Sequence, residues 1–154
     1  MQHPDESIGT FSVSPDLMCH PESLMYLVAN SSGKFPIKIA TVGFGLLHRK
    51  DGTVLSINNV QGVYGQSKKL DIFSKSAGEL WPIYLCKKLV AHAREKGFKV
   101  EGELPWPFHE ELEVEPTARD YVEKEYRRQV GHYEQTFHNL GMKKVRGKWI
   151  LPSE

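Results

Sequence analysis

One stretch decides the fold of this chain: it runs from Asn59 to Gly97 and reads NVQGVYGQSKKLDIFSKSAGELWPIYLCKKLVAHAREKG. It begins as the end of an apolar strand, closed by Gln61-Gly62, and continues through a polar loop as far as residues 74–78. Apolar residues then recur three or four positions apart from Leu80 to Ala93. This spacing predicts a core-packed helix over 79–96, and the glycine that follows predicts its C-terminal cap. The stretch is therefore a predicted strand–loop–helix unit.

A β-hairpin is predicted before this unit. Residues Ile37–Leu47 contain the β-branched residues and the alternation typical of a strand, and Val54–Val60 are typical of the returning strand. The Asp51-Gly52 pair between them favours a tight turn. Gly43 and Gly45 interrupt the first strand, so we expect a β-bulge or a close approach of another backbone there.

A strand, a long helix and a final strand or hairpin are predicted after the unit. Residues Phe98–Leu104 form a short apolar segment stopped by a proline. The order strand, helix, strand predicts a right-handed crossover that places the two strands parallel. Apolar positions from Pro116 to Leu140 recur at helical spacing and predict a second main helix, in which Gly131 is a candidate site for a bend. Residues 143–152 are predicted to close the chain as the last strand or hairpin.

The N-terminal part is predicted to contribute less. Ser, Pro, Asp and Gly separate the few apolar side chains of residues 1–16, which predicts a tail or an edge strand. Pro21 stands where a first helical turn would begin, and the apolar residues Leu24–Val28 predict a short helix that ends at residues 30–33. Together the elements predict a single α+β domain over 17–154, with a central mixed β-sheet flanked by two main helices.

The composition limits the classes of protein to consider. A chain of 154 residues with 40% apolar and 25% charged residues can bury a core without metals or disulfides. Its net charge of +1 argues against a nucleic-acid partner. The start lacks the features of a signal peptide, and no apolar run approaches the roughly 18 residues of a membrane span. Because Cys19 and Cys86 show no disulfide pattern, we expect a soluble, cytoplasmic protein.

The loop ahead of the main helix is the candidate ligand site. Ser74, Lys75 and Gly78 precede the predicted helix start, where unpaired N–H groups and the helix dipole favour an anion such as phosphate. Gln61 and Gly62 close the strand on the other side of the expected cleft. The alternative is purely structural, with a serine capping the helix and Lys75 in solvent.

Three further kinds of side chain are candidates for catalysis or metal binding: carboxylates, a thiol and imidazoles. Glu101 and Glu103 alternate along a strand and would share one face, so Glu103 is a candidate general base; an exposed face is the alternative. Cys86 lies among apolar residues of the main helix, where a thiol is typically a small buried hydrophobe. The histidines lack the H-x-x-x-H spacing of a zinc site, and no metal is predicted.

Two segments resemble the VirK/YbjX family of uncharacterised bacterial proteins. They are Gln61-Gly62 with Ser74-Lys75, Leu80 and Pro82 ahead of the helix, and Tyr133–Gly141 followed by Leu151-Pro152. Trp81 stands where that family carries arginine. The resemblance covers about residues 37–152 and implies a loose link to virulence or envelope stress.

The predicted order of hairpin, helix, strand, helix and strand is also similar to the later half of acyl-CoA N-acyltransferases. This resemblance implies an acyltransferase-like fold, in which the pyrophosphate of the acyl carrier docks at the helix after the central strand. Those enzymes place a proton-donating tyrosine where this chain has Phe137, so Tyr133, one turn earlier, is the candidate donor. The leading hypothesis is a domain that binds acyl-CoA, an acyl carrier or another phosphate-bearing ligand.

The alternative hypothesis is a non-enzymatic interaction module. Trp106 and Phe108 lie in a proline-rich link, and seven acidic residues follow between Glu110 and Glu125. Aromatic anchors of this kind are typical of surfaces that bind a protein partner.

Overall fold

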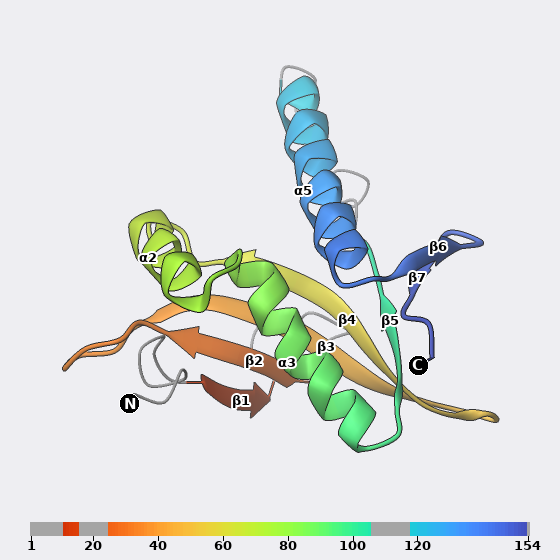
Figure 1. Cartoon of the computed structure of the whole chain (residues 1–154). Helices are drawn as coiled ribbons and strands as arrows, with labels where there is room; N and C mark the ends of the chain where they lie inside the picture. Colours follow the sequence, from red (N-terminus) through yellow and green to blue (C-terminus); the bar gives the residue numbers. More distant parts are fainter. Residues whose placement is uncertain (1–10, 16–24, 106–117, 154) are drawn as a thin grey trace.

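The computed structural model describes residues 11–15, 25–105 and 118–153. Their seven strands form one mixed sheet in the order β1-β2-β3-β4-β5-β7-β6 (Figure 1). Three helices are present in the same residues, and the predicted single α+β domain with a mixed sheet is confirmed. The elements are β1 Phe11–Pro15, β2 Met25–Asn30, β3 Lys38–Arg49, β4 Gly52–Gly62, α2 Ser67–Ala77, α3 Trp81–Glu95, β5 Lys99–Gly102, α5 Arg119–Asn139, β6 Lys143–Val145 and β7 Lys148–Ile150.

The predicted hairpin is confirmed as β3 and β4, which pair antiparallel along almost their whole length. The pairing shifts by one residue between Gly43 and Phe44, whose partners are Asn59 and Ile57. The bulge therefore lies where the glycines of β3 predict an irregularity, but the extra residue is Asn58 of β4.

The short helix predicted from Pro21 to Val28 is wrong for the residues that the structure describes. Met25–Asn30 form strand β2, which pairs antiparallel with β3. Leu27 and Ala29 are buried and alternate with half-buried neighbours, which is the pattern of a strand with one face on the core. The apolar run is too short for its spacing to separate helix from strand, and pairing with β3 decides between them. β1 pairs with β2, so residues 11–15 form an edge strand.

Helix α3 is the predicted crossover, and it lies against one face of the sheet (Figure 1). Its buried face includes Leu85, Cys86, Leu89 and Ala93. Burial of a leucine side chain contributes about 1.5–3 kcal/mol, so this face anchors the helix. The strands on either side of the crossover, β4 and β5, are parallel neighbours as predicted. Gly97 ends the connection in a left-handed conformation, with φ of 74°.

Helix α2 occupies residues that were predicted to form a polar loop, and that prediction is wrong. Leu70 and Phe73 are its two buried residues and lie one turn apart. Because the rest of the helix is mostly polar, two apolar positions are too few to show a helical period. Gly78, with φ of 76°, ends the helix and turns the chain toward α3.

Helix α5 runs without interruption through Gly131. Its buried residues are Tyr133, Thr136 and Phe137, so its C-terminal part packs on the sheet while the rest rises away from it (Figure 1). The Phe137 ring lies directly over Gly102 of β5, where a Cβ atom would be 2.8 Å from three ring atoms. A residue without a side chain is therefore required at this contact. The final hairpin is confirmed as β6 with β7.

Candidate functional site

A cavity lies where β4 runs beyond its parallel neighbour. The pairing of β4 with β5 ends at Ile57 and Gly102, but β4 continues to Gly62. Helix α5 closes the gap at one point, because the Tyr133 hydroxyl accepts a hydrogen bond from the Val60 N–H at 2.9 Å. The cavity beside this bond has a volume of about 690 Å³. It is bounded by the end of β4, one side of α2, the start of α3 and one side of α5.

The cavity has an apolar wall and a polar wall. The apolar wall comes mainly from β4 and the start of α3, with Val60, Leu80, Trp81, Pro82 and Ile83. The polar wall comes from α5, with Arg128, Gln129, His132, Gln135, Thr136 and Asn139, and from α2, with Asp71, Ser74 and Lys75. Such a lining suits a ligand that has both an apolar part and a polar or charged group.

Five of the seven residues predicted for the site line this cavity: Gln61, Gly62, Ser74, Lys75 and Tyr133. Only the tertiary structure brings them together, since they come from β4, α2 and α5. Gly62 also permits the close packing of the walls. A Cβ atom there would lie 2.8 Å from Cδ1 of Leu70 and 3.4 Å from Cζ2 of Trp81.

Ser74 has a structural bond in this site. It lies in the last turn of α2, and its Oγ accepts a hydrogen bond from the Trp81 N–H at 2.9 Å. Pro82 follows and has no N–H to offer. The first two residues of α3, Trp81 and Pro82, therefore have no free backbone N–H to offer to an anion. The structural alternative, a serine that caps the main helix, describes Ser74 correctly.

Two cationic side chains line the cavity. Lys75 is exposed in the last turn of α2, and Arg128 belongs to the part of the lining that α5 provides. Arg128 also pairs with Glu125 at 2.8 Å on the exposed side of the same helix. An exposed pair of this type contributes little, so the guanidinium can be shared with a ligand at small cost.

Tyr133 is the most buried polar group of the cavity wall, with 5% of its surface exposed. Burial raises the pKa of its hydroxyl above the ordinary value of 10.0, and the hydrogen bond from Val60 partly offsets this effect. The hydroxyl therefore stays protonated at neutral pH. Because its oxygen accepts the Val60 N–H, its own proton is available to donate to a ligand.

Two predicted residues do not line the cavity. Gly78 is the left-handed residue that ends α2. The Glu103 carboxylate accepts a hydrogen bond from the Ser56 hydroxyl at 3.1 Å. Glu101, which alternates with it, forms a two-pronged ion pair with Arg49, with N–O distances of 2.5 and 3.1 Å. The structure thus gives both carboxylates partners outside the cavity.

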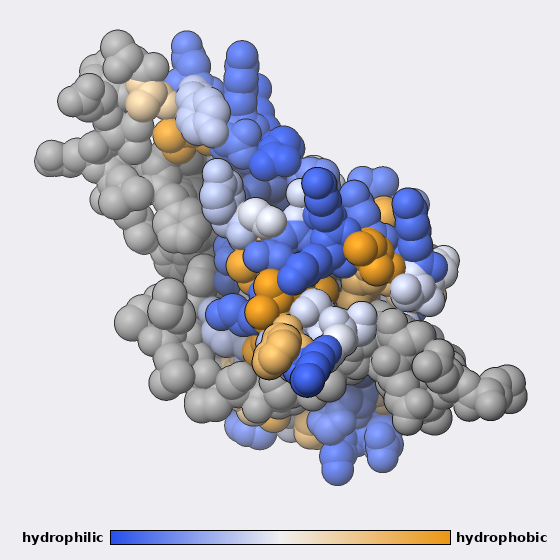
Figure 2. All heavy atoms as spheres, turned by 90° about the vertical axis from the view of Figure 1, so that its left-hand side faces the viewer, coloured by the Kyte–Doolittle hydropathy of each residue, from blue (hydrophilic) through white to orange (hydrophobic). Residues whose placement is uncertain are grey.

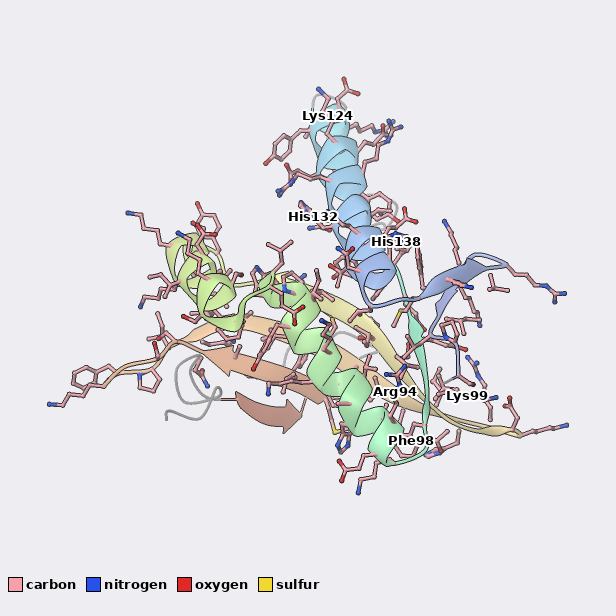
Figure 3. All side chains as sticks on the ribbon, in the orientation of Figure 1. Arg94, Phe98, Lys99, Lys124, His132 and His138 are labelled. Carbon is pink, nitrogen blue, oxygen red and sulfur yellow. The ribbon has the colours of Figure 1, made fainter. Side chains whose placement is uncertain are left out.

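Sequence reasoning missed the polar side of α5. Figure 3 shows His132 on the side of this helix toward α2, whereas His138 lies lower on the helix. Arg128, His132, Gln135 and Asn139 follow one another at intervals of three or four residues, so they share one helix face. That spacing was the available signal, but a polar stripe on a helix is ordinarily read as a solvent-facing surface.

In the part of the chain that the structure describes, no group of three or more His, Cys, Asp or Glu side chains is arranged to hold a metal ion. None of the helices in this part has the length and apolar composition needed to cross a membrane. Trp106, Phe108 and the start of the acidic segment, on which the interaction-module hypothesis depends, lie outside the described residues.

Comparison with known proteins identifies no relative of this chain. No family model, no curated protein and no solved structure matches the chain. The resemblances to the VirK/YbjX family and to acyl-CoA N-acyltransferases therefore stay predictions.

Proposed function

We propose that this protein binds acyl-CoA, an acyl carrier or another phosphate-bearing acyl ligand in the cavity between β4, α2, α3 and α5. The observation that carries the proposal is the gap beside β4, with an apolar wall on one side and the Tyr133 hydroxyl, Lys75 and Arg128 on the other. Its volume of about 690 Å³ lies within the range of roughly 300–1,000 Å³ typical of small-molecule sites.

The division of the lining supports an amphipathic anion. Binding of an acyl chain over Trp81 and Leu80 is favourable, because it removes apolar surface from water. A phosphate or carboxylate group of the ligand is stabilised by charge-assisted hydrogen bonds from Lys75 and Arg128. Asp71 is the acidic residue of the lining, so the charge of the described cavity side chains favours an anion over a cation.

The order of the elements supports the acyl-transfer version of the proposal. The hairpin, the helical crossover, β5, α5 and the last hairpin follow the order on which the acyltransferase resemblance rests. In such a reaction an amine attacks the thioester carbonyl carbon and the C–S bond breaks. Tyr133 gives its proton to the departing sulfur and recovers one from solvent. His132, which also lines the cavity, accepts the proton that the amine loses and releases it to solvent.

Thermal unfolding in the presence of ligands tests the proposal. A ligand at about one hundred times its Kd stabilises the folded state by about 2.7 kcal/mol, which raises Tm by about 5–10 °C in a chain of this size. We expect an acyl-CoA to raise Tm more than CoA, and CoA more than inorganic phosphate. Equal effects of all three, or none, would refute binding of an acyl ligand.

Lys75→Glu locates the site. Because Lys75 is exposed, we expect a Tm within a few degrees of wild type and an affinity for acyl-CoA lower by on the order of tenfold. Lys143→Glu is the matched control, because it makes the same charge change on exposed strand β6. If both substitutions weaken binding equally, the ligand responds to net charge and the cavity is not its site.

A further inference from the structure

Two turns meet at the end of the sheet opposite the final hairpin. The β3–β4 register ends with Ala40 beside Gly62 and is extended by the bond from the Val63 N–H to the Ile39 carbonyl at 2.8 Å. This bond brings the chain after β4 beside the start of β3. Figure 1 shows the β2–β3 turn and α2 at this same end of the molecule. Residues 31–38 and 63–72 thus lie at the same end of the molecule, and we name this part of its surface the lysine–aromatic end.

Apolar side chains at this end stand in solvent. Phe35 is 82% exposed, Tyr64 is fully exposed and Ile72 is 62% exposed. Ile37, two residues after Phe35, is also exposed. Single exposed apolar residues are common on protein surfaces, but here four of them share one end. Figure 2, which looks straight at this end, shows orange apolar side chains set among blue hydrophilic ones.

The charge of the lysine–aromatic end is strongly positive. Its two segments contain Lys34, Lys38, Lys68 and Lys69 and one acid, Asp71. None of these lysines makes an ion pair with another described residue. Four lysines against one aspartate give these two segments a net charge of +3, whereas the whole chain has a net charge of +1.

We propose that the lysine–aromatic end docks the protein on a membrane surface that contains anionic lipids. Lysines beside exposed aromatic and aliphatic side chains match the two layers of such a surface, because the cations face the lipid phosphates while the apolar tips enter the headgroup boundary. Ile72 lies one helical turn from Lys68, so α2 presents both kinds of side chain on one face.

The chemistry of the apolar residues favours lipid over nucleic acid. The bases of a single-stranded nucleic acid could stack on the rings of Phe35 and Tyr64, but Ile37 and Ile72 offer no flat surface to a base. Aliphatic side chains do gain free energy on entering the acyl boundary of a bilayer. Docking goes beyond the proposed ligand function and does not depend on it, since Asp71 is the one residue of this end that also lines the cavity, and Lys75 and the cavity face of α5 take no part.

Cosedimentation of the full chain with vesicles tests the proposal. We expect binding to vesicles of phosphatidylcholine and phosphatidylserine, weak binding to phosphatidylcholine alone, and a fall in binding as salt is raised. Each lysine near an anionic surface contributes about fivefold to binding, so Lys68→Gln with Lys69→Gln should lower it by about 25-fold. Phe35→Ser with Tyr64→Ser should lower it by a similar factor.

Matched controls separate the surface from general effects. Lys143→Gln with Lys148→Gln removes the same charge from the other end of the sheet, and Tyr121→Ser removes another exposed aromatic. Both should bind vesicles like wild type, and all variants should keep the wild-type Tm because the changed side chains are exposed. Equal binding to neutral and anionic vesicles, or equal losses in the control pair, would overturn the proposal. So would tighter binding to a single-stranded RNA, if the Phe35 and Tyr64 substitutions weaken that binding.

Discussion

Tyr133→Phe tests the bond that joins α5 to β4 at the cavity. The substitution keeps the buried ring and its edge-to-face contact with Phe137, at 6.2 Å between centroids, but removes the oxygen that accepts the Val60 N–H. A buried donor left without a partner costs about 1–3 kcal/mol. Because Val60 is only half-buried, we expect a loss of about 1–2 kcal/mol, which lowers Tm by about 2–8 °C.

Urea unfolding followed by tryptophan fluorescence measures this loss, and the midpoint should fall with an unchanged m-value. Tyr121→Phe is the matched control, since Tyr121 lies on the same helix with 69% of its surface exposed and should change stability by less than about 0.5 kcal/mol. If the two variants are equally stable, the hydroxyl does not hold β4 and α5 together.

Alkaline pH gives a second readout for the same variant. Burial raises the pKa of Tyr133 above 10.0, so the folded state keeps a proton that the unfolded state releases. The corresponding stability is complete below about pH 10 and is lost as pH rises through the folded-state pKa. Wild type should therefore lose stability more steeply above pH 10 than Tyr133→Phe. Parallel curves would show that this tyrosine is not buried as described.

The remaining predictions concern the core. Gly102→Ala places a Cβ 2.8 Å from three atoms of the Phe137 ring and should cost about 1–3 kcal/mol. Phe137→Leu combined with Gly102→Ala should recover part of that cost, whereas losses of stability that simply add would show that the ring does not lie over Gly102. Gly131→Ala should instead stabilise the protein by about 0.5–1 kcal/mol, because Gly131 lies in the middle of α5 with open space around it. Burial raises the pKa of Cys86 from 9.0 to about 12, so its stability contribution is complete below pH 9 and falls by on the order of 4 kcal/mol as pH rises toward 12. Cys86→Ala should flatten that part of the pH profile measured by urea unfolding, and an unchanged slope would contradict the burial of the thiol.

The sequence by itself determined the elements whose patterns are long and regular. Helix α3 keeps an apolar position every three or four residues for four turns, and the hairpin combines β-branched runs with an Asp-Gly turn. Such patterns have one structural solution, because another period would expose the apolar face. The parallel placement of β4 and β5 then follows from the length of the crossover between them.

Only the tertiary structure decided the two short elements that the sequence misassigned. The run from Met25 to Asn30 is apolar enough for either a helix or a strand, and pairing with β3 makes it a strand. Helix α2 has too few apolar positions for its helical period to be recognised in the sequence. It forms because Leu70 and Phe73 pack into the hydrophobic core beside α3. In both cases long-range contacts outweigh weak local preferences.

The candidate site divides in the same way. The residue types at Gln61, Ser74 and Lys75 indicated a polar site between β4 and α3, but the sequence predicted Ser74 and Lys75 on a loop at a helix start, with Gln61 at the end of the strand. In the structure these residues share a cavity with Tyr133 and the polar face of α5. This cavity exists because β4 runs beyond β5 and because the glycine at position 102 lets α5 pack against the sheet. The relative lengths of two paired strands and the fit of a ring over a backbone are properties of distant segments in contact, so no local pattern encodes the cavity.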